Sequence, residues 1–286
     1  MKNVIIDGNN SMWRVYSTHK NFIKNHPGIV GMFRMYISLL RKFGKDCVYY
    51  FVWDGGKSCK RVRLYPEYKK KEEILTSEWK QMCEEIINEI NLFSSFLGCL
   101  PVYSIKIPGA EGDDVIACVS TLVNEDCVIV STDEDFFQLL VSPRISVYNP
   151  VKDVIYNSTN FKSIMGMDRE KFLLYKSLIG DTSDNIKGVP GIGPKRAREI
   201  VSKYSVRDIM LERVEGKFSK LLKEYRERIL LNMSLISLDL GKDLKEKVYS
   251  RIKEGRRQLV DLKSIEKLLW EYNIIELYDV LKEITW

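Results

Sequence analysis

The sequence predicts an α/β fold in which a mostly parallel sheet is flanked by helices and followed by a second, helical part. Two observations lead to this prediction. Short apolar runs of strand length alternate with longer helical segments up to about Gly180, a pattern typical of parallel sheets. Beyond about Asp181 these runs stop, and glycine-punctuated, charged, helical sequence follows. We therefore place a domain boundary between Gly180 and Lys187.

Each predicted strand is a short apolar run, and each predicted helix is a longer segment. The run Cys47–Trp53 (CVYYFVW) is continuously apolar and aromatic, which is typical of a strand buried on both faces. The predicted strands are Val4–Ile6, Cys47–Trp53, Val102–Ile107 and Cys127–Val130. The predicted helices are Ile29–Lys42, Ser77–Leu97, a segment that begins at Glu111, and the end of the segment Gly188–Lys203.

The composition indicates a folded protein without a membrane segment. Hydrophobic residues make up 45% of the 286 residues, which is enough for a core. No apolar run reaches transmembrane length and the N-terminus lacks a signal-peptide pattern, so a cytoplasmic protein is expected. The six cysteines form no C-x-x-C pair and the chain has two histidines, which argues against a zinc site and a disulfide framework.

Nine carboxylates follow predicted strands or stand where predicted helices begin. Like charges at close range raise each other's pKa and oppose folding, whereas a divalent cation such as Mg²⁺ favours oxygen ligands. The formal net charge is nevertheless +6, so a concentrated acidic spot would lie in a basic surround, which suits a bound polyanion. The nine residues are Asp7, Asp54, Glu111, Asp113, Asp114, Asp133, Asp135, Asp181 and Asp184.

Three of these aspartates are predicted to share one edge of the sheet. Asp7, Asp54 and Asp133 each follow an apolar strand, and sites in open α/β sheets form outside the carboxyl ends of the strands. Any one of them alone is better explained as a helix cap or a turn residue. The whole set at one edge favours two Mg²⁺ or Mn²⁺ ions, which about 3.5–4 Å apart can clamp the attacking and leaving oxygens of a phosphodiester.

The acids of the segment 111–114 are the densest group. Glu111 and Asp114 are three residues apart, so they are expected near one face of a helix. Asp113 is expected to point elsewhere unless the first turn is irregular. A metal site of this kind needs no histidine base, because the ion lowers the pKa of its bound water.

The segment 57–71 carries seven basic residues and one acid, and it follows Asp54 closely. A solvated charge run is the default interpretation of such a stretch. Its position over the proposed site and its interleaved tyrosines instead favour phosphate contact and base stacking.

The segment Gly188–Ala197 predicts a different kind of contact. Its glycines allow the backbone to approach a ligand closely, and the helix that follows presents unpaired N–H groups to a phosphate. Lys195 and Arg196 add positive charge. The alternative is an ordinary glycine-rich turn between two helices.

Seven motifs occur in order along about the first 200 residues. Together they resemble the flap endonuclease / 5′→3′ exonuclease family, in particular its bacteriophage and bacterial branch, which includes the 5′-nuclease domain of DNA polymerase I. The motifs begin at Asp7 (DGNN), Trp53 (WDGGK), Tyr65 (YPEYK), Glu111 (EGDD), Ser131 (STDED), Gly180 (GDTSDN) and Gly188 (GVPGIGPK).

The resemblance implies a PIN-like (resolvase-like) nuclease domain over residues 1–185 with a helical arch at about 57–85. It also implies a helical duplex-DNA-binding domain over 186–286, with a helix–three-turn–helix motif at about 186–204. The family's first metal site matches Asp7, Asp54, Glu111, Asp113, Asp114 and Asp133, and its second matches Asp135, Asp181 and Asp184. The implied cofactors are two Mg²⁺ or Mn²⁺ ions, with K⁺ at the helix–three-turn–helix motif.

The resemblance also assigns roles to basic and aromatic residues. Lys69 matches a lysine that touches the scissile phosphate, Arg61 an arginine of the arch, and Arg14 an arginine near the 5′ side of the site. Tyr68 is expected to stack a terminal base. The residues expected to contact DNA are Lys57, Lys60, Arg63, Tyr68, Lys70, Gly191, Gly193, Lys195 and Arg196.

The function implied is a Mg²⁺-dependent 5′–3′ exodeoxyribonuclease and flap endonuclease of DNA replication or repair. Its partners would be DNA with 5′ flaps or free 5′ ends and RNA/DNA primers, and nothing in the sequence suggests an oligomer. Two alternatives stay open. A PIN-type ribonuclease would show fewer acids and no glycine-rich clamp after Asp184. A non-catalytic junction-binding protein would show gaps in the acidic set.

Overall fold

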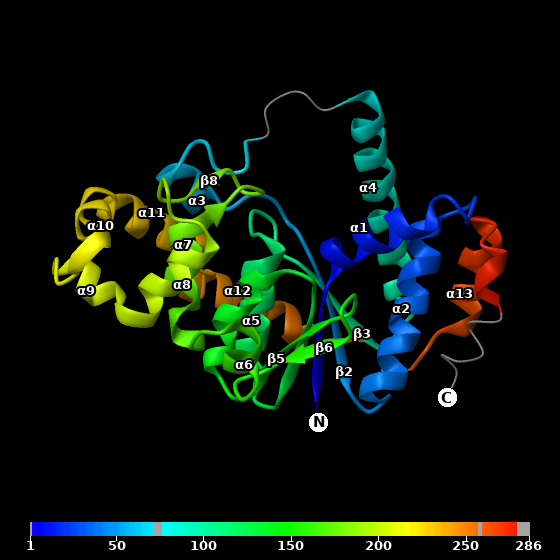
Figure 1. Ribbon diagram of the computed structural model, residues 1–286. Coiled ribbons are helices and arrows are strands. Elements are labelled where there is room, and N and C mark those ends of the chain that lie inside the picture. The colour runs from blue at the N-terminus through cyan, green and yellow to red at the C-terminus, as the bar shows by residue number, and fades with distance from the viewer. Residues whose placement is uncertain (1, 71–75, 257–258, 279–286) are drawn as a thin grey trace.

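A six-stranded sheet forms the centre of the molecule in the computed structural model, which describes residues 2–70, 76–256 and 259–278 (Figure 1). The strand order is β3-β2-β1-β4-β5-β6. The first five strands of this order are mutually parallel, and β6 is antiparallel to β5. Their bounds are β1 Asn3–Asp7, β2 Val48–Trp53, β3 Val102–Lys106, β4 Cys127–Val130, β5 Ile145–Asn149 and β6 Val154–Tyr156.

The four predicted strands are confirmed, and so is the mostly parallel α/β class. Strands β5 and β6 were missed, because ISVYN and VIY are short and carry polar residues. The chain leaves β1 toward β2 and β3 on one side and then returns to β4 on the other. The carboxyl ends of β1 and β4 therefore border the switch point where open α/β sheets bind ligands.

Alternate residues of the strands enter two cores on opposite faces of the sheet. Val4 and Ile6 of β1 pack with α1, α2 and α4, whereas Ile5 packs with α5. This alternation is what a period of two residues dictates for a sheet covered on both faces. The helices are α1 Gly8–His19, α2 Pro27–Phe43, α4 Ser77–Leu97 and α5 Gly112–Leu122. The three helices predicted in this half of the chain are confirmed.

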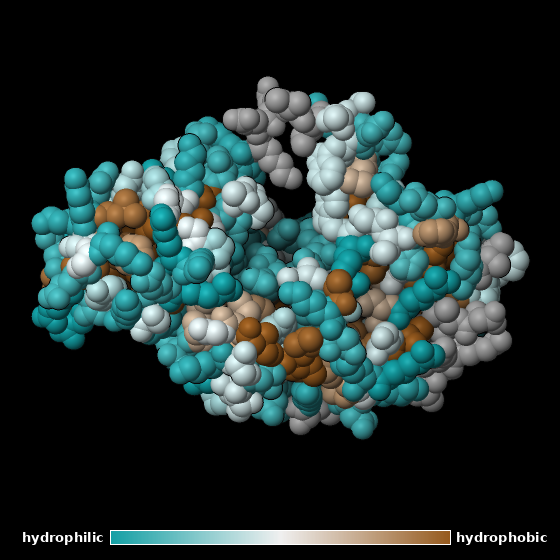
Figure 2. Space-filling view, in the orientation of Figure 1, coloured by the Kyte–Doolittle hydropathy of each residue, from teal (hydrophilic) through white to brown (hydrophobic). Residues whose placement is uncertain are grey.

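The surface is hollowed between the upper end of α4 and the short helix α3 (Cys59–Leu64), and hydrophilic residues line much of the hollow (Figure 2). The parallel strands run upward in Figure 1, so their carboxyl ends face this hollow. Residues 71–75 of the predicted arch, including Lys71, lie outside the described residues, as do 257–258 and 279–286 of the predicted second domain.

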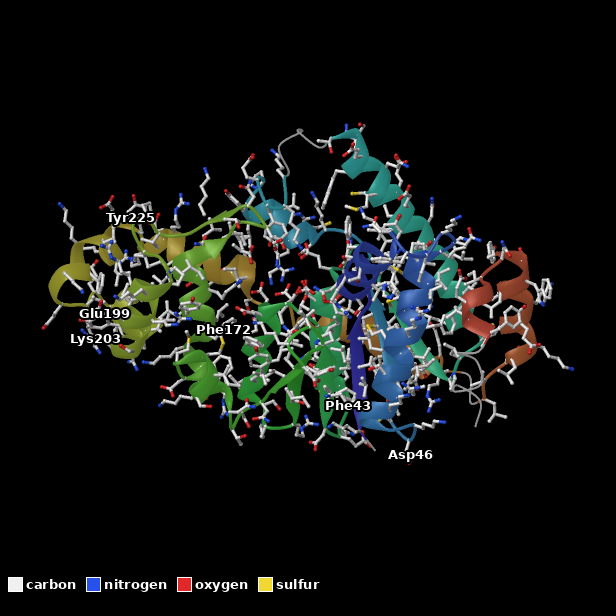
Figure 3. The ribbon with its side chains drawn as sticks, turned by 45° about the vertical axis from the view of Figure 1, so that its right-hand side comes forward. Phe43, Asp46, Phe172, Glu199, Lys203 and Tyr225 are labelled. Atoms are coloured by element: carbon white, nitrogen blue, oxygen red, sulfur yellow. The ribbon has the colours of Figure 1, made fainter. Side chains whose placement is uncertain are left out.

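Helices α7 to α11 build a lobe beside the sheet. In Figure 3, Glu199 and Lys203 lie at the outer side of this lobe, away from the sheet. A two-stranded antiparallel ribbon, β7 Gly180–Asp181 and β8 Ile186–Lys187, precedes the glycine-rich turn, so the prediction that strands stop at about Asp181 was wrong by this one short pair. The helices of the lobe are α7 Phe172–Ile179, α8 Pro194–Lys203, α9 Val206–Met210, α10 Ser219–Glu224 and α11 Arg226–Ile236. Helix α12 (Lys242–Lys253) instead packs against α5 and β3.

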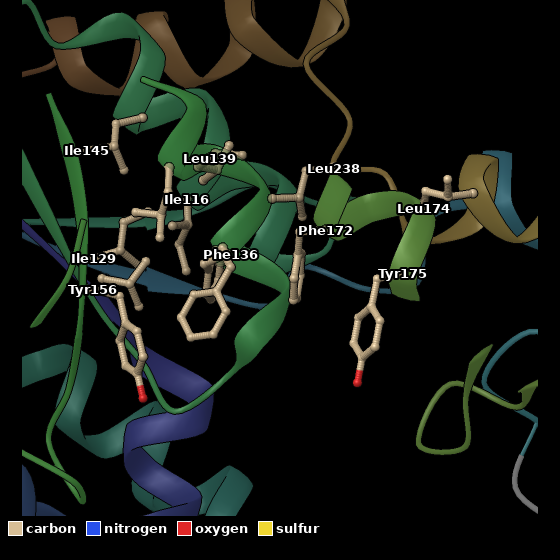
Figure 4. Close-up of a cluster of buried hydrophobic side chains, with 14 of the residues drawn as sticks. Ile116, Ile129, Phe136, Leu139, Ile145, Tyr156, Phe172, Leu174, Tyr175 and Leu238 are labelled. Carbon is tan, nitrogen blue, oxygen red and sulfur yellow. The ribbon is translucent and has the colours of Figure 1, made fainter. Parts of the chain in front are cut away.

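One hydrophobic core joins the lobe to the sheet. Figure 4 shows Phe136 and Phe172 side by side with Ile129 of β4 and Leu238, which follows α11. The 3₁₀ helix Glu134–Val141 supplies Phe136 to this core. Because all four side chains are buried in one cluster, the lobe is packed onto the sheet domain rather than tethered to it.

The last described helix, α13 (Leu262–Glu271), does not belong to the lobe. Its buried residues Ile265 and Leu269 share a core with α2 and α4 on the other face of the sheet. The prediction that 186–286 form one helical domain is therefore wrong for this helix. Among the described residues, no helix is both long enough and apolar enough to span a membrane.

Candidate active site

Asp7 and Asp133 lie at the ends of the neighbouring strands β1 and β4. Asp7 ends β1 and caps α1, with its Oδ1 accepting from the Asn10 N–H at 3.1 Å. Ser131 bridges the two strands, because its hydroxyl donates to Asp7 Oδ2 at 2.8 Å and accepts from the Asp133 N–H at 3.0 Å. Asp133 in turn caps the following 3₁₀ helix by accepting from the Asp135 N–H at 2.8 Å.

Glycines let the helices that follow begin close to the strands. The Gly112 N–H donates to Asp54 Oδ1 at 2.6 Å, and a Cβ on Gly112 would stand only 2.9 Å from that oxygen. A Cβ on Gly8 would meet the Trp53 ring at 2.6 Å. Asp54, which follows β2, is thereby held at the same sheet edge as Asp7.

Asp7, Asp54, Asp113 and Asp133 act on one another electrostatically. Burial raises the pKa of Asp7 to about 7, and Asp133 and Asp54 add to this effect. Burial also raises the pKa of Asp113 well above its ordinary value, with further contributions from Asp7, Asp133 and Asp54. Asp113 therefore belongs to the central acidic group, contrary to the expectation that it points elsewhere.

Asp114 faces away from that group. Its two oxygens accept from the Arg61 guanidinium at 2.6 and 2.7 Å, and Oδ1 also accepts from the Asp239 N–H at 2.8 Å. The expectation that Asp114 contributes to the first metal site is not supported, because both of its oxygens are already hydrogen-bonded to protein donors.

Glu111 is the carboxylate with the most protein partners at this edge. Its Oε1 accepts from the Ser58 N–H at 2.9 Å, while Oε2 accepts from Arg61 at 3.1 Å, Tyr68 at 2.8 Å and Lys69 at 3.1 Å. Burial opposes ionisation of Glu111, but Lys69, the Ser58 N–H and Arg61 outweigh it and lower the pKa. Glu111 therefore links the base of the arch to the sheet edge as a carboxylate.

Two roles expected in the arch segment are corrected. Arg61 is 4% exposed, and its guanidinium is hydrogen-bonded to Asp114, Glu111 and two backbone carbonyls, so it is not presented to a phosphate. Tyr68 is 2% exposed, and its ring packs against Ile186 and Leu235, so it is not presented to a base. Both residues instead fix the arch base to the rest of the fold.

Lys69 is held between Glu111 and Asp184. Its ammonium lies 3.1 Å from Glu111 and 3.6 Å from Asp184, and the side chain is 28% exposed. The backbone of Lys69 is left-handed (φ 51°), and its N–H donates to the Asp184 carbonyl at 3.0 Å. This unusual conformation for a lysine is the sort found at functional positions, and the expected phosphate contact stays a prediction.

The acids of the predicted second site meet a lysine that the sequence did not single out. Lys176 Nζ lies 2.9 Å from Asp135 Oδ1 and 3.1 Å from Asp181 Oδ2. Burial and the neighbouring Asp133 raise the pKa of Asp135 to about 7. The signal in the sequence was a single charge inside the otherwise apolar helix α7 (FLLYKSLI).

The acidic side chains lie at the same edge of the sheet, but their carboxylates do not come together at a single metal-binding point. Among the described residues, no three carboxylate, imidazole or thiol groups are close enough to hold a metal ion as placed. The oxygen donors nevertheless suit a hard divalent cation. Asp135 Oδ1 is buried and has no hydrogen bond, although Lys176 Nζ is close, so this oxygen retains an unused acceptor position. The donor set therefore fits a divalent metal ion.

Arg14 lines a surface pocket of about 540 Å³ together with Asn10, which donates to Asp7, and Thr132, which precedes Asp133. Of the predicted DNA contacts, Lys195 and Arg196 are exposed, and Arg196 donates to the Gly191 carbonyl at 2.6 Å. Gly191 is left-handed (φ 76°) and Gly193 caps α8. The arch residues Lys57, Lys60, Arg63 and Lys70 are also exposed.

Two family models cover most of the chain. The model described as the 5′-3′ exonuclease N-terminal resolvase-like domain matches residues 2–166, and the one described as the 5′-3′ exonuclease C-terminal SAM fold matches residues 167–259. The chain belongs to the 5′-3′ exonuclease family. This confirms the resemblance drawn from the seven motifs.

Named relatives of this 5′-3′ exonuclease family member extend over most of its length. A 5′-3′ exonuclease of Aquifex aeolicus is 30% identical over 98% of this chain and 94% of its own. Flap endonuclease Xni of Shewanella pealeana is 32% identical over 83% of this chain and 91% of its own. The zinc-bound structure of the T5 5′-exonuclease shares the fold, with a TM-score of 0.69 and 24% identity over 99% and 100% of the two chains.

Proposed function

We propose that the protein is a structure-selective 5′ nuclease that hydrolyses DNA phosphodiesters near single-strand/double-strand junctions. The observation that carries the proposal is the gathering of Asp7, Asp54, Asp113 and Asp133 at the carboxyl edge of the sheet, and this edge faces the hollow between α3 and α4. Membership of the 5′-3′ exonuclease family and the named flap endonuclease relatives support the same activity.

The residues that would hold divalent ions, Mg²⁺ or Mn²⁺, fall into two groups. Asp7, Asp54, Asp113 and Asp133 would form the first, and Asp135, Asp181 and Asp184 the second. Glu111, whose two oxygens both accept from protein donors, would support the first group from beside it. When bound, the ions would activate a water for attack and neutralise charge on the phosphate. No described residue near the acids is a histidine, so activation of the water is not assigned to an imidazole base.

The chain's own cations would place the substrate. Lys69 is partly exposed beside Glu111 and Asp184, where its ammonium can meet the scissile phosphate. The exposed turn around Gly191, with Lys195 and Arg196, would hold the duplex backbone, where such contacts position DNA without reading sequence. Carbonyl oxygens of this turn would hold K⁺, whose positive charge would favour a phosphate beside it.

The partners proposed are DNA with 5′ flaps or free 5′ ends and RNA/DNA primers. The protein would act as a monomer in the cytoplasm of a bacterial cell or a phage-infected host. These statements follow the family assignment and the exposed basic segments on both sides of the acidic edge.

The decisive experiment compares a 5′-flap DNA, a blunt duplex and a single-stranded RNA, each with Mg²⁺ or with EDTA. We expect Mg²⁺-dependent cleavage, fastest on the flap near the junction. Preferred cleavage of RNA would replace the proposal with a PIN-type ribonuclease. Tight flap binding without cleavage under any metal condition would identify a junction-binding protein instead.

A further inference from the structure

Lys176 places a positive charge between two acids of the proposed second metal site. Its Nζ lies 2.9 Å from Asp135 Oδ1 and 3.1 Å from Asp181 Oδ2, with 14% of the lysine side chain exposed. Helix α7 ends at Ile179, and the left-handed Gly180 (φ 76°) turns the chain so that Asp181 lies against the helix that carries Lys176. The turn at the end of α7 therefore brings Asp181 into contact with Lys176.

The ammonium leaves this acidic pair incompletely satisfied. Asp135 Oδ1 is buried and receives no hydrogen bond, because Lys176 approaches it off the hydrogen-bonding direction while donating to Asp181 Oδ2. A buried oxygen that has a nearby ammonium but no aligned donor recovers only part of the cost of its burial. A divalent cation accepts six or more oxygen ligands, so it can contact both carboxylates at once, which one ammonium does poorly here.

The Asp181 carboxylate and the backbone of Asp135 are held by contacts that do not involve the lysine. Asp181 Oδ1 accepts from the Ser183 N–H at 2.9 Å and from its hydroxyl at 2.5 Å, which leaves Oδ2 facing Lys176. The Asp135 N–H donates to Asp133 Oδ1 at 2.8 Å. If the lysine moved away on its flexible four-carbon stem, Ser183 would still hold the Asp181 carboxylate, and Asp133 would still fix the backbone from which the Asp135 side chain projects.

We propose that Lys176 is a built-in counter-cation of the Asp135–Asp181 pair, which a divalent ion must displace to occupy the second site. The proposal rests on the proposed function, because it takes these acids as metal ligands. Without metal, Lys176 offsets the cost of two neighbouring buried carboxylates. With metal, the same ammonium competes for the same oxygens and lowers the affinity of this site relative to one without the lysine.

The test is Mn²⁺ binding to the full chain without DNA, measured by isothermal titration calorimetry. Lys176→Met removes the charge and keeps an unbranched side chain. We expect one Mn²⁺ site of this variant to bind more tightly than in the wild type, by on the order of tenfold. The matched control is Lys171→Met, at a half-exposed lysine just before α7 whose ammonium donates to the Ser202 carbonyl, and it should leave both affinities unchanged.

A second substitution assigns the gain to this pair. In the double variant Lys176→Met/Asp181→Asn, the tightened site should be lost, because one of its carboxylates is gone. Lys176→Gln provides an independent neutral variant that can still donate to Asp181. We expect it to gain Mn²⁺ affinity as Lys176→Met does.

Thermal unfolding distinguishes a lysine that competes with the metal ion for Asp135 and Asp181 from one that only forms a structural ion pair with them. We expect Lys176→Met to unfold at a lower temperature than the wild type in EDTA and to recover the difference in saturating Mn²⁺. Unchanged Mn²⁺ affinity in both neutral variants, or a loss that Mn²⁺ does not recover, would overturn the proposal. If neither the wild type nor the variants bind Mn²⁺, both the role of Lys176 and the proposed metal centre are refuted. If all of them bind Mn²⁺ with equal affinity, only the role of Lys176 is refuted.

Discussion

The guanidinium of Arg61 and the carboxylate of Asp114 are joined by two hydrogen bonds of 2.6 and 2.7 Å, with both side chains buried. The pair connects α3, at the base of the arch, to α5, which starts at the acidic edge. Arg61 also donates to the carbonyls of Leu235 and Ser237 at the end of α11, at 2.7 and 2.9 Å. One side chain therefore ties the arch to both the sheet domain and the helical lobe.

Replacing Arg61 should destabilise the whole molecule. Arg61→Met leaves the buried Asp114 carboxylate without its cation and removes one of the two cations beside Glu111, and breaking such a buried pair costs about 3–5 kcal/mol. Urea unfolding monitored by circular dichroism measures this cost. Arg63→Met, at an exposed arginine of the same helix, is the control and should change the free energy of unfolding by less than about 0.5 kcal/mol. Equal stabilities of the two variants would contradict the structural role of Arg61.

The sequence was sufficient to place the acids that follow strands. Asp7, Asp54 and Asp133 come directly after apolar runs, and parallel strands must bring their carboxyl ends to one edge. This reasoning needs only the period and polarity of the strands. It succeeded because buried parallel strands are nearly continuous apolar runs, which are easy to recognise.

The orientation of Asp113 and Asp114 could not be obtained in the same way. Helical spacing predicts which residues share one face of a helix, but it does not predict which part of the fold packs against that face. Here Arg61, distant in sequence, binds Asp114 and leaves Asp113 toward the central acids. Lys176 was missed for the same reason, since its role depends on where the turn at Gly180 returns the chain.

The basic arch segment shows how composition can mislead. Seven basic residues and two tyrosines suggested a uniform DNA-binding surface, yet Arg61 and Tyr68 are buried. Spacing within the six-residue helix α3 was too short to show a buried face. Packing of Tyr68 against the lobe, in a cluster with Leu235 and Ile236, decided which side chains point inward.

Asp133 offers the sharpest test of the acidic edge. Asp133→Asn keeps an oxygen that can accept from the Asp135 N–H, so the fold should survive while a negative charge is lost. We expect single-turnover cleavage of a 5′-flap DNA in Mg²⁺ to fall by on the order of 10²-fold or more. Flap binding in EDTA should be unchanged or tighter, because one charge that repels phosphate is gone.

The neighbouring residue Glu134 is the matched control for this substitution. Glu134 is half-exposed and lies 3.9 Å from Lys152, away from the other acids. Glu134→Gln should cleave the flap at the wild-type rate. Wild-type cleavage by Asp133→Asn would refute the assignment of the acidic edge as the catalytic centre.

Lys195 tests the glycine-rich turn as a duplex contact. It is exposed in the first turn of α8, two residues after Gly193, and no residue that the structure describes forms a hydrogen bond or ion pair with its side chain. Lys195→Ala should weaken duplex binding and make the slope of log K against log salt shallower by about one unit. Fluorescence anisotropy at several salt concentrations measures both.

Lys203, at the other end of α8, serves as the control for Lys195. Its ammonium lies 3.5 Å from Glu199, and both residues face outward from the lobe in Figure 3. Lys203→Ala should leave the salt slope unchanged. The same slope change in both variants would show that general charge, rather than the turn, holds the duplex.

Gly55 should tolerate no side chain, because a Cβ there would stand 1.8 Å from the Ile107 carbonyl oxygen. The backbone around it is fixed by the Gly55 N–H to the Ala110 carbonyl and by the Gly109 N–H to the Gly55 carbonyl. Gly55→Ala should therefore cost about 3 kcal/mol by urea unfolding and slow flap cleavage, because Asp54 must shift. Gly193→Ala, where a Cβ meets no atom within 4 Å, should cost no more than about 1 kcal/mol. If the two variants lose similar free energies of unfolding, the loop after β2 can move to accommodate a side chain at Gly55.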